Sequence, residues 1–330
     1  MFNSSRKAGW RGGLALLLLC SGMAVPAEAE ASAKPYVETM PKRGFHLIVR
    51  PKEQTPAAQW EYVQKLDRLG KDRAASRQAL ALRIFWPNAP EAPGAQWFHA
   101  RLLERRKRLQ AAFDAYQHLV DHYAGRFEFN ETIERQMQIA KTIMATRKGK
   151  FLFLPGFAAP ERAIPLFEKI VASAPEWTGS AEAYYLIGVA HQKIYEYDLA
   201  IDAFFTALNR FPDSEFAVRA AYAQAQCHLR MSEDAPNDGR ALETAWAACA
   251  LFLQRYPDSE HRAAIESDLA RLRARQADNA YARARYYDRI LRKPESALIE
   301  YRAFAALFPH AAQTPDVRRR IEELSPSTEK

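Results

Sequence analysis

Small and bulky residues recur along this chain at fixed distances ahead of a helix-breaking position. Counting back from Pro212, Ala200 lies twelve residues earlier and Phe204 eight residues earlier. Because residues four apart share one face of a helix, such a pair indicates a face that packs closely on a neighbouring helix. The pattern occurs six times; the other pairs are Ala75 and Ala79, Ala112 and Tyr116, Ala163 and Phe167, Ala245 and Cys249, and Ala297 and Tyr301, ahead of stops at Pro87, Ala124, Pro175, Pro257 and Pro309.

The stops divide the chain into units of similar length. Successive stops lie 37, 51, 37, 45 and 52 residues apart, which fits a basic unit of roughly 34–37 residues that loops sometimes lengthen. Two stops lie in nearly identical stretches, RFPDSE at 210–215 and RYPDSE at 255–260. Proline cannot continue a helix, whereas Asp, Ser and Glu suit the start of the next one. We therefore predict that both stretches join successive helical repeats.

One unit, at residues 181–213, matches a known consensus. It resembles the tetratricopeptide repeat at Tyr184, Ile187, Gly188, Ala200, Phe204, Ala207 and Pro212, with His191 where a tyrosine is usual. The chain is therefore predicted to be all-α, a tetratricopeptide-repeat α-solenoid of about five to six helical hairpins over residues 55–324. We expect a short extended segment at 30–54, with a strand at 44–51, one long helix at 259–292, and a flexible tail at 325–330.

The N-terminus has the pattern of a bacterial secretory signal. Arg6, Lys7 and Arg11 precede the apolar run LALLLLC at 14–20, and small residues follow. This run is too short to span a bilayer as a helix, so we predict a cleaved signal peptide at residues 1–29 and export of the remaining chain. Cys20 also suggests a lipoprotein whose lipidated N-terminus would be this cysteine. Leu19 does not fit the small residue that a lipobox has before its cysteine, so both readings stay open.

Composition narrows the function classes further. The chain is 48% hydrophobic with 13 glycines, which favours a packed helical protein over a Gly-rich nucleotide-binding fold. The formal net charge is +8, but basic and acidic residues alternate, and no basic tract with interleaved aromatics indicates nucleic-acid binding. We interpret the charge as solvated helix surface. Cys227 and Cys249 fall on neighbouring antiparallel helices at different heights, so two separately buried thiols are expected rather than a disulfide.

Catalytic signatures are missing from the sequence. It has no G-x-S-x-G elbow, no P-loop and no G-x-G-x-x-G, which predicts a protein without enzymatic activity, catalytic residues or cofactor. The stretch HLVDH places His118 and His122 one helical turn apart, a spacing that can bind zinc. Because no third ligand accompanies them, solvated histidines are the favoured interpretation and no metal site is predicted.

Two places suggest contact with a partner. In the unit at 181–213 the repeat pattern directs Glu182, Tyr185 and Gln192 toward the concave groove, where they would bind a ligand or form inter-helix contacts. The insertion KGKFLFLPGFAAP at 148–160 contains five large apolar residues, and we single out its phenylalanines as candidate contacts: Phe151, Phe153 and Phe157. They would form a local core, or bind a partner protein or the membrane surface.

Three stretches together resemble a particular family, the BamD-like lipoproteins of outer-membrane β-barrel assembly. They are FEFNETIERQMQIA at 127–140 with the following GKFLFL, the fourth-repeat region at 221–260, and LARLRARQADNAYARARYY at 269–287. The resemblance covers most of residues 59–309. It implies a periplasmic scaffold at the inner face of the outer membrane. Its C-terminal repeats would dock on the barrel-forming partner, and its N-terminal repeats would bind unfolded outer-membrane proteins.

The leading hypothesis is therefore a non-enzymatic, exported scaffold that binds a β-barrel assembly complex and unfolded outer-membrane proteins, without nucleic acid and with peripheral attachment to the outer membrane. The alternative is another exported tetratricopeptide adaptor, serving division, secretion or peptidoglycan coordination. An envelope hydrolase is a third class, which the missing catalytic signatures disfavour. Co-purification with a β-barrel assembly protein separates the first two.

Overall fold

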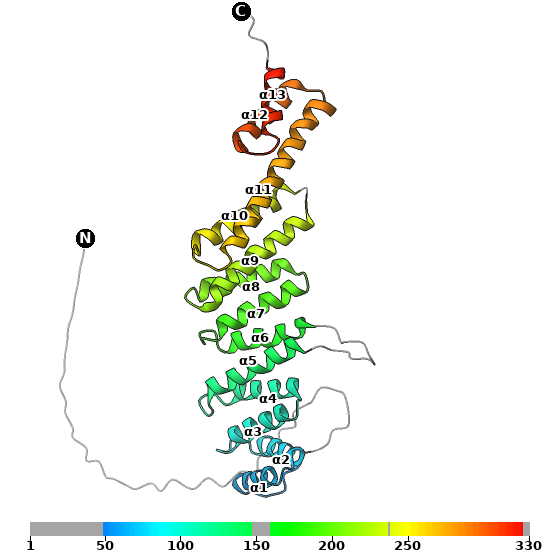
Figure 1. Ribbon diagram of the computed structural model, residues 1–330. Helices are drawn as coiled ribbons and strands as arrows, with labels where there is room; N and C mark the ends of the chain where they lie inside the picture. The colour runs from blue at the N-terminus through cyan, green and yellow to red at the C-terminus, as the bar shows by residue number, and fades with distance from the viewer. Residues whose placement is uncertain (1–48, 147–158, 237, 326–330) are drawn as a thin grey trace, which may run out of the picture.

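The chain folds into a column of stacked helices. A computed structural model describes residues 49–146, 159–236 and 238–325 (Figure 1). The helices are α1 (Pro56–Arg68), α2 (Asp72–Phe85), α3 (Ala92–Arg105), α4 (Leu109–His122), α5 (Phe129–Ala145), α6 (Ile164–Ser173), α7 (Ser180–Lys193), α8 (Tyr197–Arg210), α9 (Glu215–Asp234), α10 (Gly239–Arg255), α11 (Arg262–Arg285), α12 (Pro294–Leu307) and α13 (Thr314–Leu324), with a 3-10 turn at Pro160–Ala163 and a π-helical turn at Tyr286–Ile290.

Consecutive helices pack against one another from α1 to α13. The described residues contain no strand. Each repeat is a hairpin of a first and a second helix, for example α7 followed by α8, and the hairpins stack along one axis (Figure 1). This arrangement confirms the predicted all-α solenoid of tetratricopeptide-type hairpins. None of the described helices has the length and apolarity needed to cross a membrane.

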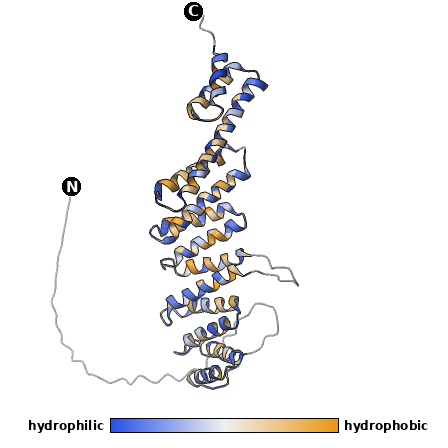
Figure 2. Cartoon of the chain, viewed as in Figure 1, coloured by the Kyte–Doolittle hydropathy of each residue, from blue (hydrophilic) through white to orange (hydrophobic). Residues whose placement is uncertain are grey.

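The predicted register of small and bulky residues is confirmed by burial. All six small residues of the repeated pattern are fully buried: Ala75, Ala112, Ala163, Ala200, Ala245 and Ala297. Their bulky partners Phe167 and Phe204 are fully buried as well. At Gly188 of α7, a Cβ would lie only 2.5 Å from the Phe204 ring, so this glycine allows α7 and α8 to approach closely. Figure 2 shows hydrophobic residues distributed along the whole column rather than in one central core.

The joints between repeats follow the sequence prediction only in part. Helices α8 and α10 end one residue before the aromatic of each joint, and the N–H groups of Phe211 and Tyr256 still donate to helical carbonyls. Ser214 is the N-cap residue of α9, as the sequence suggests, but its buried hydroxyl makes no capping hydrogen bond with a described residue. At the second joint α11 starts only at Arg262, and the Ser259 hydroxyl accepts the His261 N–H at 3.2 Å in the preceding turn.

Helix α11 joins two cores. Ile265 and Leu272, in its first part, pack with α9 and α10, whereas Ala277 and Ala284 pack with α12 and α13. The long helix expected at 259–292 therefore exists, but it gives way to the π-helical turn at Tyr286–Ile290. Because one continuous helix contributes to both cores, it holds the C-terminal helices α12 and α13 in a defined position relative to the earlier helices.

Several sequence predictions concern residues outside the described part of the chain. These are the signal peptide with Cys20, the extended segment up to residue 48 with most of its predicted strand, the insertion with Phe151, Phe153 and Phe157, and residues 326–330 of the predicted tail. Within the described residues, Thr55 is the N-cap of α1, and its hydroxyl accepts the Ala58 N–H at 3.3 Å.

Candidate protein-interaction surfaces

The three predicted groove residues lie on one face of α7. Glu182, Tyr185 and Gln192 are each half-buried, and their spacing along the helix places them on the same side. The Glu182 carboxylate lies 2.5 Å from Nζ of Lys141 on α5, the first helix of the preceding hairpin. The face formed by the first helices is thus continuous from α5 to α7. Glu182, one of its charged residues, is already paired with Lys141.

Tyr185 is held by packing. Its ring centroid lies 5.8 Å from that of Phe204 on α8 and 5.7 Å from that of Phe216 on α9. These contacts fix the ring between three helices, so the tyrosine serves as an inter-helix contact of the kind that the sequence left open. Its half-exposed edge still faces the same side as Glu182. Ligand binding at these residues remains a prediction.

The histidine pair on α4 is placed unfavourably for a cation. His118 and His122 approach each other, with 2.6 Å between their Nδ1 atoms, and the Arg83 guanidinium also contacts His118. His122 is exposed as expected, but His118 is half-buried. A fixed positive charge against one imidazole opposes binding of a metal ion at the pair. Among the described residues no group of three or more metal-ligating side chains is positioned to hold a metal.

The two described cysteines are free and fully buried, as predicted. Burial raises the pKa of the Cys227 thiol and of the Cys249 thiol to about 12. At neutral pH both remain protonated, and a protonated buried thiol is a poor nucleophile. These cysteines therefore belong to the core and do not form a reactive site.

The outer faces of the second helices can be compared position by position, because every stop lies at the same point of its repeat. Ten and six residues before the stop, α4 has Asp114 and His118, and α8 has Asp202 and Thr206. At three and two residues before the stop, α4 has Asp121 and His122, and α8 has Asn209 and Arg210. In these two hairpins the outer face is polar, as expected for a surface in contact with water.

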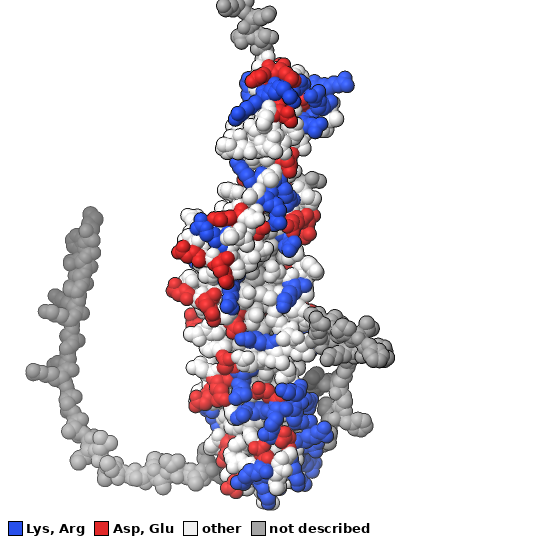
Figure 3. Space-filling model, in the orientation of Figure 1, with Lys and Arg blue, Asp and Glu red and all other residues white. Residues whose placement is uncertain are grey.

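The corresponding face of α12 is apolar. It presents Ile299, Ala303, Ala306 and Leu307, and all four residues are exposed. The exposed fractions of Ile299 and Leu307 are 69% and 57%. Helix α10 is intermediate, since it has Ala247 and Leu251 at the first two positions and polar residues at the last two. We name the four α12 residues the α12 stripe. In Figure 3 few charged atoms lie over α12.

A hollow adjoins one end of the α12 stripe. It has a volume of about 650 Å³ and lies between α11 and the turn that follows α12. Leu307 belongs to both the stripe and the hollow, and Phe308, Ala270 and Ala274 add further apolar lining. The Arg273 guanidinium carbon lies 4.4 Å from the centroid of the Phe308 ring and closes one side. The stripe and the hollow together form one apolar surface. A side chain of a partner protein could insert into the hollow while the stripe contacts its neighbours.

Sequence reasoning missed the α12 stripe. The signal was available, because the repeat register alone aligns Ile299 with Asp202 of α8 and Asp114 of α4. The buried pairs define the repeat register, whereas the exposed positions differ from one hairpin to the next, and this difference is visible only when the hairpins are aligned.

Comparison with known proteins gives matches to structures only. Neither a protein-family model nor a curated protein matches the chain. Solved structures similar to it include a thermophilic TPR protein from Thermus thermophilus, at 19% identity and TM-score 0.31, covering 66% of this chain and 100% of that one. Another is the C-terminal part of a TPR repeat-containing protein from Cytophaga hutchinsonii, at 17% identity and TM-score 0.33, covering 81% and 88%. A third is a tetratricopeptide repeat protein from Parabacteroides merdae, at 13% identity and TM-score 0.30, covering 82% and 99%.

At this level of identity and superposition, the similarities say nothing about partner or reaction. The assignment of the fold follows instead from the helices of this chain, their antiparallel pairing and the burial of the repeated alanines. On that evidence the protein is an α-solenoid of tetratricopeptide-type hairpins, an architecture suited to binding other proteins.

Proposed function

We propose that the chain is a non-enzymatic, exported scaffold of outer-membrane β-barrel protein assembly, and that its last hairpin docks the barrel-forming partner through the α12 stripe. The observation that supports docking at this end is the replacement of polar by apolar residues on α12 alone at all four outer positions. Exposed apolar groups of this kind, arranged in one row, are typical of protein interfaces.

Two further features support this proposal. The secretory pattern at residues 1–29 favours export, and lipidation of Cys20 would attach the chain to the inner face of the outer membrane. The shared helix α11 holds the α12 stripe at a fixed distance from the earlier hairpins. Such a scaffold could bind unfolded outer-membrane proteins along its first helices while its last hairpin is docked. Glu182, Tyr185 and Gln192 are the described candidates for that second contact.

The experiment that tests the proposal is co-purification from solubilised membranes with the double variant Ile299→Asp, Leu307→Asp. Each side chain buried at an interface contributes about 1.5–3 kcal/mol, so losing two should weaken association by roughly two orders of magnitude or more. Because Ile299 and Leu307 are exposed in the free chain, the melting temperature of the double variant should stay close to that of the wild type.

The control is Asn209→Asp, Gln254→Asp. These positions on α8 and α10 correspond to Ala306, and both are exposed, so the control adds the same charge to an already polar surface. It should retain the partner. Retention of a β-barrel assembly protein by the α12 double variant would contradict the proposal. Capture by the wild type of a division or secretion protein instead would favour the alternative adaptor.

A further inference from the structure

Positive charge is concentrated in the first two hairpins. Residues 49–125 contain 13 Lys and Arg against 8 Asp and Glu, whereas the described residues from 126 to 236 contain 9 against 14. The column is therefore basic at its N-terminal end and acidic in its middle. In Figure 3 the basic atoms gather on one side of the lower column, over α1 to α4.

The two turns that contribute much of this charge have the same backbone geometry. In the α1–α2 turn, the Gly70 N–H donates to the Asp67 carbonyl at 2.8 Å, and in the α3–α4 turn the Lys107 N–H donates to the Glu104 carbonyl at 2.8 Å. Gly70 and Lys107 both have positive φ, of 68° and 57°. They occupy equivalent positions one repeat apart, so the two turns project from the same edge of the solenoid.

Arg105 ties the two turns together. Its guanidinium donates to Asp72 at 2.8 Å and to Asp67 at 2.7 Å, and both carboxylates belong to the preceding hairpin. The two acids of the α1–α2 turn are thereby paired with a single arginine, and Glu104 of the α3–α4 turn lies 3.5 Å from Arg135. Six other basic side chains of the two turns form what we call the basic edge: Lys65, Arg68, Lys71, Arg106, Lys107 and Arg108. None of these six forms an ion pair with another described residue.

Lys107 lies at the tip of the α3–α4 turn. Its positive φ is a conformation that glycine adopts without strain and that Gly70 occupies in the preceding repeat. The same turn position in later hairpins, at Tyr195 and Arg292, also has positive φ, of 65° and 52°. The conformation therefore belongs to the turn, and at Lys107 it places a long cationic side chain at the turn tip. Leu69, at the tip of the other turn, is 58% exposed, so an apolar side chain projects from the same edge.

We propose that the basic edge binds the surface of a bilayer containing anionic phospholipids. Unpaired lysines and arginines on neighbouring turn tips can contact several phosphate groups at once, and Leu69 can enter the region just below the headgroups. The cations project from turns and do not line a groove, which suits a flat surface better than an inserted acidic peptide. The turns at residues 65–73 and 104–108 have no aromatic side chain for base stacking, which disfavours RNA. This contact is independent of the partner that docks at α12.

The test is vesicle co-sedimentation of the full chain and of the variant Arg68→Gln, Lys71→Gln, Lys107→Gln, Arg108→Gln. The vesicles contain phosphatidylcholine alone or phosphatidylcholine with phosphatidylglycerol. All samples share the same N-terminal segment, so the informative quantity is the preference for the anionic vesicles. Each basic residue near such a surface adds about 1 kcal/mol, so this preference should fall at least about tenfold in the variant. It should also vanish for the wild type in roughly 1 M salt, where the screening length is about 3 Å.

A matched control removes four exposed basic residues from the other end of the chain: Arg240, Lys293, Arg302 and Arg318, each changed to Gln. It should keep the preference for anionic vesicles, and both variants should melt as the wild type does. An equal preference in the basic-edge variant and the wild type would overturn the proposal. So would equal loss in the control, because net charge alone would then explain binding. Binding to soluble polyglutamate without binding to anionic vesicles would also overturn it, in favour of an acidic protein partner.

Discussion

Replacing Ala200 by Trp should destabilise the middle of the array by more than about 3 kcal/mol, because overpacking a well-packed core typically costs about 1–3 kcal/mol even for smaller additions. Ala200 is fully buried on α8, in a cluster with Phe204, Ala207 and Cys227. One turn further along α8, the Phe204 ring lies against Gly188 of α7, so the two helices are in close contact near Ala200.

Chemical denaturation followed by circular dichroism measures this effect. The control is Asp202→Trp, two residues further along the same helix at an exposed position, which should change the midpoint little. Equal midpoints for the two tryptophan variants would mean that the repeat register is wrong.

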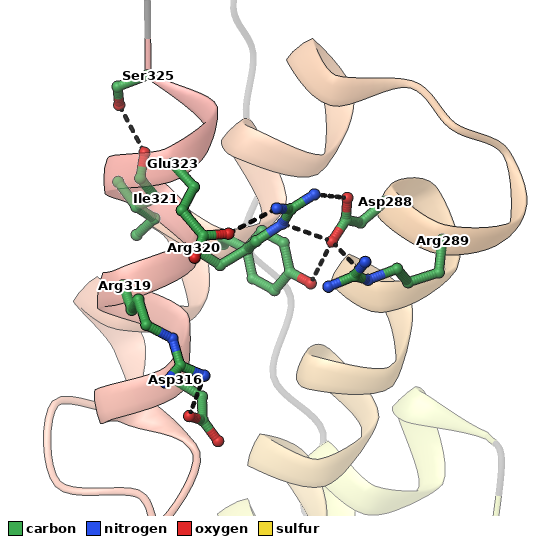
Figure 4. A network of polar contacts seen from close by, with 9 residues as sticks. Asp288, Arg289, Asp316, Arg319, Arg320, Ile321, Glu323 and Ser325 are labelled. Atoms are coloured by element: carbon green, nitrogen blue, oxygen red, sulfur yellow. Dashed lines mark hydrogen bonds and ion pairs between the residues drawn. The ribbon is translucent and has the colours of Figure 1, made fainter.

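Replacing Asp288 by Ala should destabilise the last hairpin by about 1.5–3 kcal/mol, because it removes a buried carboxylate that accepts charged hydrogen bonds, while Arg320 stays partly exposed and paired with Glu323. The Asp288 side chain is only 4% exposed. It accepts hydrogen bonds from Arg320 at 2.8 and 2.9 Å and from the Tyr301 hydroxyl at 3.2 Å, and Arg289 lies 3.3 Å away (Figure 4). The matched control, Asp316→Ala, removes an exposed partner of Arg319 and should cost no more than about 1 kcal/mol.

The same carboxylate predicts how stability depends on pH. Hydrogen bonds from Arg320 lower the pKa of Asp288 below its usual value. The stabilisation is therefore complete above the unfolded pKa, about 3.9 for Asp, and is lost as the pH falls through the lower, folded pKa. Thermal unfolding between neutral and strongly acidic pH should show this loss in the wild type. A steep acid dependence that persists in Asp288→Asn would assign the effect to other groups.

The sequence predicted features that depend on residues close together in the chain better than features that depend on distant residues. Spacing within one helix predicted the buried faces, since Ala200 and Phe204 are four residues apart and face one neighbour whatever the rest of the chain does. Helix ends were predictable from proline for the same reason. The position of the Ser214 cap was predictable too, but the lack of a capping hydrogen bond from its buried hydroxyl was not.

Contacts between repeats could not be predicted from local pattern. The Lys141–Glu182 pair spans 41 residues, and the contact of Arg83 with His118 spans 35. The basic edge was predictable from the sequence, since its two turns lie one repeat apart and both are rich in Lys and Arg. The net charge of the whole chain combines these basic residues with the acids of the middle hairpins. It therefore indicated a surface on which both charges are evenly mixed.

The most direct test of the account is photo-crosslinking in cells from position 299, with position 202 as the comparison. A photoreactive phenylalanine analogue would replace Ile299 on the apolar face of α12 or Asp202 at the equivalent point of α8, where both side chains are exposed. We expect a crosslink from position 299 to an outer-membrane β-barrel assembly protein, and no such adduct from position 202. Equal adducts from the two positions, or adducts from position 299 only to cytoplasmic proteins, would contradict it.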